Sequence, residues 1–346
     1  MTTSASPQDL ETARLLLNRL GVDPAELLAA GPPPGDEASR PRPMPTIREW
    51  IPVVAALLSP STAASYGSYW AKADAVWGDR PMDTITASEI KAQSEIARTT
   101  AVVRRNSRGG RNAAENFIAA IRCLYKHLEN DGRIDQHLNP ARRVTKPRRN
   151  ASTRRALPNA QLSELNDVVA STGDDPELDA LLCRLHEETA CRRGGALALR
   201  RRDLDPRQCV ILLREKGGTE RWQPVSPTLM RHLLANSDER GSGDPDEQLL
   251  RYANRNPITK RRYDYIFRRV CAELDWARAL QVSAHWLRHT TLTWVERNFG
   301  IGVARAYAGH ADTGSDLTTT SYVKADITEV AAALAALTGE PHPLAV

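Results

Sequence analysis

The chain has 346 residues, of which 41% are hydrophobic, and a net charge of +5 at neutral pH. Its length predicts two domains plus a tail, and its apolar runs are too short to cross a bilayer, so we do not expect a membrane protein. No secretory apolar segment follows Met1, and the five cysteines lack CxxC spacing. We therefore expect a cytoplasmic protein without disulfides or a zinc site.

The positive charge is concentrated in one part of the chain. Residues 1–40 have a net charge of −3, residues 41–155 of +10, and residues 156–346 of −2. Phosphate contacts gain affinity from released counterions, so a concentrated basic region favours a nucleic-acid partner. An arginine-rich but merely solvated surface is the alternative.

Residues 1–45 are expected to hold an N-terminal helix and a linker. Leucines recur at helical spacing in residues 8–30, and residues 31–45 are rich in Pro and Gly. The segment is acidic and shows no strand pattern, which disfavours a separate DNA-binding arm domain.

Residues 46–140 are expected to form a small helical domain. Thr46 and Ser61 can each cap a helix, and Thr86 with Glu89 has the spacing of a capping box. Residues 111–130 carry apolar side chains at three- to four-residue spacing. The pattern predicts a helical bundle.

Two arginine-rich segments of this region are candidate DNA-phosphate contacts. One precedes the helix at 111–130, and the other is a basic linker at 141–155 that contains seven Lys or Arg and no acid. The candidate residues are Arg104, Arg105, Arg108, Arg111, Arg142, Arg143, Lys146, Arg148 and Arg149.

Residues 156–346 are expected to form the larger domain. Helices are predicted over 158–169, 176–188, 284–298 and 328–337, with another around Tyr263–Val270. Residues 209–214 and 220–225 read as two strands joined by a glycine turn. The predicted fold is mainly α, with a small antiparallel β-sheet in this domain.

Six side chains in this domain suit the attack of a tyrosine on a DNA phosphodiester. The transition state places negative charge on two non-bridging oxygens, which two guanidinium groups can bind while staying charged. A lysine can protonate the leaving oxygen, histidines can manage the proton of the nucleophile, and cations favour ionisation of the tyrosine. The candidates are Arg192, Lys216, His285, Arg288, His310 and Tyr322.

Each of these residues alone has a more ordinary structural interpretation, and only the set in this order favours catalysis. His285 and His289 could also share a metal on one helix face, as in a metal hydrolase. However, Trp286 stands where such an enzyme has a glutamate, and no acidic third ligand is evident. We therefore expect no metal and no cofactor.

The order of these residues resembles the tyrosine recombinase (phage integrase) family over about residues 45–337. The segments that carry the resemblance are Thr189–Leu199, Glu215–Val225, Ser283–Thr290, Ala308–His310 and Thr318–Tyr322. The two most specific are the His-x-x-Arg box at Ser283–Thr290 and the Thr-Thr-x-x-Tyr box that ends at Tyr322.

The resemblance implies a fold, an activity and partners. Residues 46–140 would be the core-binding (SAM-like) domain and residues 156–346 the catalytic domain, which together form a C-shaped DNA clamp. Tyr322 would form a 3′-phosphotyrosyl bond without metal or ATP. The protein would act as a homotetramer on two duplexes that carry its recombination site, associated with the nucleoid. A catalytically decayed recombinase that only binds DNA is the alternative.

Three features depart from the family pattern. The family often has an acidic residue three places after the first arginine, where this chain has Gly195, so the group that orients Arg192 is not identified by the sequence. Ala190 replaces a common glycine. The spacing from His310 to Tyr322 is about three residues longer than usual, and the extra residues are expected to loop out. The choice among integration, excision, dimer resolution and cassette exchange stays open.

Overall fold

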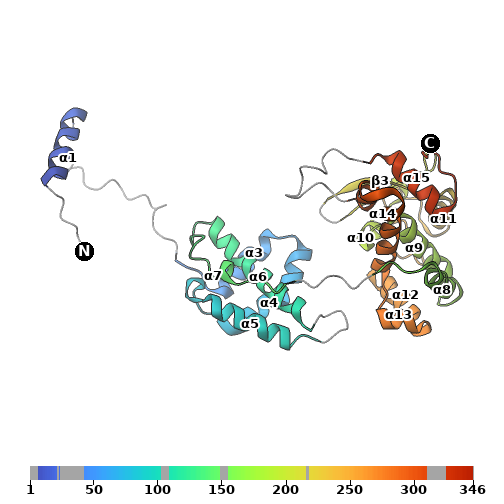
Figure 1. Cartoon of the computed structure of the whole chain (residues 1–346), viewed down its shortest axis with the longest axis horizontal. Helices are drawn as coiled ribbons and strands as arrows, with labels where there is room; N and C mark the ends of the chain where they lie inside the picture. Colours follow the sequence, from blue (N-terminus) through green and yellow to red (C-terminus); the bar gives the residue numbers. More distant parts are fainter. Residues whose placement is uncertain are drawn as a thin grey trace. The chain divides into compact units, whose positions relative to one another are not determined.

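The computed structural model describes residues 7–21, 23, 43–102, 109–148, 155–215, 218–309 and 325–345. The chain divides into two compact units, Met1–Asn150 and Ala151–Val346 (Figure 1). Each unit has its own hydrophobic core. Within the described ranges, no helix is long and apolar enough to span a membrane.

The N-terminal helix α1 spans Pro7–Leu20 and is shorter than the sequence pattern predicts. Gly21 follows it with φ +67°, a left-handed conformation that commonly ends helices. The second half of the predicted helix, with Leu27 and Leu28, falls largely outside the described residues. Leu15 and Leu16 on α1 are exposed.

The helices of the first unit begin at capping residues. Thr46 and Glu49 form a capping box, as do Thr86 and Glu89, which confirms both predicted caps. The second helix starts at Ser59 rather than at the predicted Ser61, because Ser59 accepts from the Thr62 backbone and is followed by a proline that suits the first helical position. The elements are α3 (Ile47–Leu57), α4 (Pro60–Trp77), the short 3₁₀ helix η2 (Met82–Thr84), α5 (Ala87–Thr99), α6 (Arg111–Asn130) and α7 (Pro140–Arg143).

The core of this unit lies around α6, whose predicted span is confirmed. Buried aromatic side chains anchor its neighbours to the backbone. Trp50 Nε1 donates to the Leu124 carbonyl at 3.0 Å, and the Tyr125 hydroxyl donates to the Met82 carbonyl at 2.7 Å. Such bonds satisfy the polar atom of each ring, so that the apolar body can be buried at no polar cost.

The start of the basic linker packs onto the first unit. Ala141 and Val144 are buried in its core, and Arg122 of α6 donates to both of their carbonyls, at 3.1 and 2.7 Å. The sequence assigns residues 141–155 to a linker because proline and arginine dominate there, yet the two small apolar side chains anchor residues 141–144 to α5 and α6.

The second unit is mainly helical with one small sheet, which confirms the predicted fold class. Its helices are α8 (Asn159–Ser171), α9 (Pro176–Thr189), α10 (Arg193–Leu197), the 3₁₀ helix η4 (Arg201–Asp203), α11 (Pro227–Arg240), α12 (Lys260–Glu273), α13 (Asp275–Leu280), α14 (Ala284–Ala308) and α15 (Ile327–Thr338). Its antiparallel sheet has the order β1 (Leu204–Asp205), β2 (Val210–Arg214) and β3 (Glu220–Pro224).

Helix α9 is central to this unit and packs against α8, α11, α14 and α15 (Figure 1). Helix α14 is two helical segments joined at Gly300, whose φ of 82° and ψ of 170° are not helical. This break lies just after the end of the predicted helix at 298. Helix α15 packs on its own unit, with Val330, Ala331 and Leu334 buried.

Candidate active site

The candidate site is built around the C-terminus of α9. The last carbonyls of a helix have no partner inside the helix. Here side chains from distant segments satisfy them: Thr291 Oγ1 donates to the Glu187 carbonyl at 2.7 Å, and the Tyr307 hydroxyl donates to the Glu188 carbonyl. The end of α9 is thereby tied to both segments of α14.

Arg288 lies at the centre of this arrangement. Its Nη1 donates to the Ala190 carbonyl and its Nη2 to the Ala308 carbonyl at 2.8 Å. Ala190 has φ +49°, so the chain turns sharply after α9 and aims this carbonyl at the guanidinium. Arg288 is 4% exposed, and burial, with Arg192 nearby, lowers its pKa to about 10. The guanidinium is therefore still charged at neutral pH.

Arg192 immediately precedes α10 and faces a buried carboxylate. Its backbone N–H donates to Glu215 Oε1 at 2.8 Å, and its Nη1 donates to Glu215 Oε2. Arg288 Nη1 lies 3.8 Å from the same Oε1, and the Glu215 side chain is 1% exposed. One carboxylate thus contacts both of the predicted catalytic arginines.

A third arginine, Arg221 of β3, completes the cluster and was not predicted from the sequence. Its Nη2 donates to the Thr189 carbonyl at 3.3 Å, and burial lowers its pKa. Gly309 approaches it so closely that a Cβ would lie 2.5 Å from Arg221 Nε. Gly309 also has φ +63°, so glycine is required there on both counts.

An open groove of about 1080 Å³ runs beside this cluster. Arg192, His285 and Arg288 line it together, so the structure brings three of the six predicted site residues to one surface. His285 is exposed on the first turn of α14, one turn before Arg288. Further cationic side chains of the lining are Arg193, Lys260, Arg268 and Arg278.

The other three predicted site residues, Lys216, His310 and Tyr322, lie outside the described residues. The described chain stops next to each segment that carries them. Glu215 directly precedes Lys216, and Gly309 directly precedes His310. The catalytic roles of all six residues remain predictions.

The hydroxyls of two tyrosines near the cluster form hydrogen bonds within the fold. The Tyr307 hydroxyl donates to the Glu188 carbonyl, and the Tyr263 hydroxyl lies 2.9 Å from His186 Nε2. Burial raises the pKa of both phenols. Neither is therefore suited to act as a nucleophile, since attack requires an exposed and readily ionised hydroxyl.

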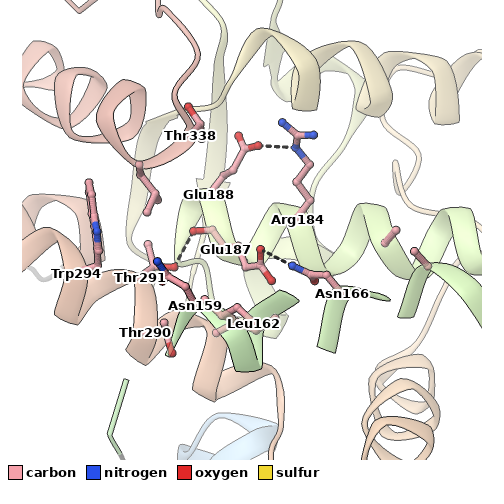
Figure 2. A pocket seen from close by; sticks show the side chains of 14 residues that line it. Asn159, Leu162, Asn166, Arg184, Glu187, Glu188, Thr290, Thr291, Trp294 and Thr338 are labelled. Atoms are coloured by element: carbon pink, nitrogen blue, oxygen red, sulfur yellow. Dashed lines mark hydrogen bonds and ion pairs between the residues drawn. The ribbon is translucent and has the colours of Figure 1, made fainter. Parts of the chain in front are cut away.

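A second pocket of about 540 Å³ lies on another side of α9 (Figure 2). Glu187 lines it and accepts from Asn166 Nδ2 at 3.2 Å through Oε2. Its Oε1 is buried and has no hydrogen-bond partner among the described residues. Burial, with the nearby Glu188, raises the pKa of Glu187 to about 7.

The predicted DNA contacts of the first unit fall into three groups. Arg104, Arg105, Arg108 and Arg149 lie outside the described residues. Arg111 opens α6, whereas Arg143, Lys146 and Arg148 lie at or just after α7. Arg142 forms two bonds with Glu129, at 2.7 and 2.9 Å, so its charge is already paired within the unit.

The predicted metal alternative finds no support in the geometry. Across the described ranges, no group of three or more His, Cys, Asp or Glu side chains is arranged to hold a metal ion.

Comparison with known sequences gives matches along most of the chain. Residues 155–328 match the family model of the phage integrase family. The tyrosine recombinase XerC of Pelobacter propionicus is 25% identical over 259 residues, which are 73% of this chain and 82% of that protein. XerC of Chromobacterium violaceum is 25% identical over 262 residues, with 74% and 83% covered.

Comparison with solved structures shows the fold. A lambda integrase dimer bound to a COC′ core site gives a TM-score of 0.59 at 16% identity, covering 79% of this chain and 97% of that one. A lambda integrase tetramer bound to a Holliday junction gives 0.58 at 15% identity, covering 94% and 89%. The Tn1549 transposon integrase with circular intermediate DNA gives 0.59 at 15% identity, covering 81% and 95%.

The family model spans half of the chain and includes the segments that carry Arg192, Arg288 and Tyr322. The fold of the solved integrases is the mainly helical fold described above. The chain belongs to the phage integrase family, the tyrosine recombinases.

Proposed function

We propose that this protein is a site-specific DNA recombinase that cuts and rejoins DNA through a 3′-phosphotyrosyl bond to Tyr322. The observation that carries the proposal is that Arg192 and Arg288, far apart in the sequence, share one buried carboxylate at the edge of an open, cationic groove. A scissile phosphate in this groove would meet both guanidinium groups.

The arginines would stabilise the transition state. A guanidinium has five N–H donors, and the carbonyls of Ala190 and Ala308 engage two of those on Arg288. The remaining donors can bind a non-bridging phosphate oxygen. Because both arginines are held before substrate binds, little reorganisation is needed when charge develops on the phosphate.

The proposed reaction would conserve the energy of the broken phosphodiester bond in the phosphotyrosyl bond. The Tyr322 oxygen attacks phosphorus and loses its proton to a histidine, His285 or His310, while the bond to the 5′-oxygen breaks. Lys216 would donate the proton that this leaving oxygen needs. A 5′-hydroxyl of another strand then attacks the phosphotyrosyl bond and reverses the step, so neither ATP nor a metal ion is consumed.

Double-stranded DNA is the proposed substrate, bound by both units. The lambda integrase and Tn1549 integrase structures contain DNA, and one of them is a tetramer on a Holliday junction. We propose the same substrate class and a tetramer for this chain. In the first unit, Arg111, Arg143, Lys146 and Arg148 are the proposed phosphate contacts among the described residues, together with Arg142, which also pairs with Glu129.

The test is to trap the covalent intermediate. The full chain is incubated with sheared genomic DNA of its host in the presence of EDTA and then denatured with SDS, and protein-linked fragments are sequenced. We expect fragments joined through Tyr322 that share one sequence, and none with Tyr322→Phe. Equal adduct formation by Tyr322→Phe would contradict the proposed nucleophile. DNA binding without any adduct would instead favour a decayed recombinase.

A further inference from the structure

Gly195 leaves a space that the Glu215 side chain fills. A Cβ added at residue 195 would lie 3.3 Å from Glu215 Cγ and 3.6 Å from Glu215 Oε1. The family pattern often places an acidic side chain at this position, three residues after the first arginine. In this chain a carboxylate reaches the same place from the residue after β2, and the absence of a side chain at 195 makes room for it.

The contacts of Glu215 join two segments that are distant in sequence. Oε1 accepts from the Arg192 backbone N–H at 2.8 Å and lies 3.8 Å from Arg288 Nη1, while Oε2 accepts from Arg192 Nη1. The Glu215 backbone N–H donates to the Thr219 carbonyl at 2.8 Å, which closes the strand turn that carries Lys216. Glu215 therefore contacts both arginines, and it directly precedes the predicted lysine in the sequence.

We infer that Glu215 is the positioning residue that orients Arg192 and Arg288 toward the scissile phosphate, in place of an acid at residue 195. The inference rests on the proposed function, because it assigns a role within that reaction. Glu215 itself is 1% exposed at its side chain and is behind the arginines, so it is not expected to touch DNA.

Electrostatics explain why a carboxylate is needed at this point. Arg192, Arg221 and Arg288 crowd together. Burial, with repulsion from Arg192 and Arg221, opposes the charged state of Arg288 and lowers its pKa. A carboxylate between them offsets this repulsion and fixes the direction of each guanidinium. Without it, the arginines would separate in the absence of substrate and would have to be gathered again during reaction.

Two substitutions separate this role from a merely structural one. Glu215→Gln keeps an oxygen that can accept from the Arg192 backbone N–H but removes the charge, and Glu215→Ala removes both. The probe is a 5′-labelled nicked duplex carrying the site recovered by covalent trapping with the wild-type chain. We expect the rate of adduct formation to fall about tenfold in Glu215→Gln and about 100-fold in Glu215→Ala, the loss typical of a misplaced catalytic group. The Kd for the duplex should stay within about threefold.

Moving the acid provides the decisive test. Gly195 has no positive φ, so a side chain is compatible with its backbone once the Glu215 carboxylate is gone. We expect Gly195→Glu combined with Glu215→Ala to recover at least about tenfold of the lost rate, since the new carboxylate enters the same space. Gly195→Glu alone should be slow, because two carboxylates would then compete for one position.

A matched control tests for general loss of structure. Asp175 also accepts from a backbone N–H and pairs with a buried arginine, Arg240, but it lies at the start of α9, the opposite end from the site. Asp175→Asn should lower Tm as Glu215→Gln does, yet keep the wild-type rate of adduct formation below Tm.

Three results would overturn the inference. These are a wild-type rate in Glu215→Ala, no recovery in the double variant, and an equal loss of rate in Asp175→Asn. If the wild-type chain forms no adduct with any DNA, the proposed function fails first. The inference about Glu215 is then overturned with it, whereas an active wild type with active Glu215 variants overturns the inference alone.

Discussion

Consecutive residues at the end of α9 face two different surroundings. His186 lines the cationic groove, and Glu187 lines the second pocket (Figure 2). Each side holds a carboxylate with at least one buried oxygen. On the groove side, Glu215 is contacted by two arginines. On the pocket side, Glu187 accepts from the neutral amide of Asn166, and burial raises its pKa to about 7.

The difference shows that burial does not by itself decide what a carboxylate does. Surrounded by guanidinium groups, it organises charge that a phosphate can use. Where burial and the like-charged Glu188 outweigh the hydrogen bond from the Asn166 amide, the ionised form of the carboxylate is costly, and the protein is less stable when it titrates. The groove side is thus suited to catalysis, and the pocket side to a dependence of stability on pH.

The largest expected effect is on the groove side, from Arg288→Lys. An ammonium cannot satisfy the Ala190 and Ala308 carbonyls and bind a phosphate oxygen at once in the geometry of the guanidinium. The rate of adduct formation on the recovered duplex should fall about 10²–10³-fold, the usual loss for one transition-state donor. Single-turnover kinetics at saturating protein measure it.

Arg297→Lys is the matched control, because Arg297 is an exposed arginine of the same helix. It should keep the wild-type rate. If Arg288→Lys formed the adduct at the wild-type rate, the fixed guanidinium groups would not be the feature that makes the groove, rather than the pocket, suited to catalysis.

The next effect is on the pocket side, from Glu187→Gln. Because the folded-state pKa of about 7 lies above the ordinary value of 4.5, the folded protein binds more protons than the unfolded chain between these values, and stability falls as pH rises from about 4.5 to 7. Glutamine cannot ionise. The variant should therefore be more stable than wild type at pH 8, by up to about 3 kcal/mol, and nearly equal at pH 4.5.

Urea unfolding of the full chain at both pH values measures this difference. Glu273→Gln, at an exposed position of α12, serves as the control and should leave the pH dependence unchanged. A constant difference between Glu187→Gln and wild type at pH 4.5 and pH 8 would show that Glu187 is not neutralised by its pocket.

Much of the fold could be predicted because its signals are local. The capping boxes at Thr46 and Thr86 and the apolar repeat of residues 111–130 each fix a helix without help from distant residues. The helix predicted over residues 8–30 is not one continuous helix, because α1 ends at Leu20 and Gly21 has a left-handed backbone, and most of the span after Gly21 lies outside the described residues. The spacing of leucines alone does not reveal where the backbone adopts a left-handed conformation.

The site could be predicted only in part, because its geometry depends on distant segments. The motifs located Arg192 and Arg288, but nothing in their spacing indicated that Glu215 fills the room left by Gly195. The one available signal was the absence of an acid at residue 195. Two arginines that lie close together need a carboxylate beside them, so another segment had to supply it. Arg221 gave no separate signal, because its partners are a carbonyl at the end of α9 and the side chain of Gln223 on its own strand, and neither belongs to a recognisable motif.

The smallest expected effect concerns the bond that ties α9 to α14 on the pocket side. Thr291 Oγ1 caps the Glu187 carbonyl at 2.7 Å, and Thr291 is 4% exposed. Thr291→Val keeps the shape but leaves this carbonyl without its donor, which should cost about 1 kcal/mol of unfolding free energy. Because no ionisable group is changed, the loss should be the same at pH 4.5 and pH 8, whereas the gain in stability expected for Glu187→Gln should appear only at the higher pH. Urea unfolding measures both variants side by side. A loss that appears only at pH 8 would mean that the hydrogen bond to the Glu187 carbonyl depends on ionisation of the Glu187 side chain. The two would then not contribute separately to stability.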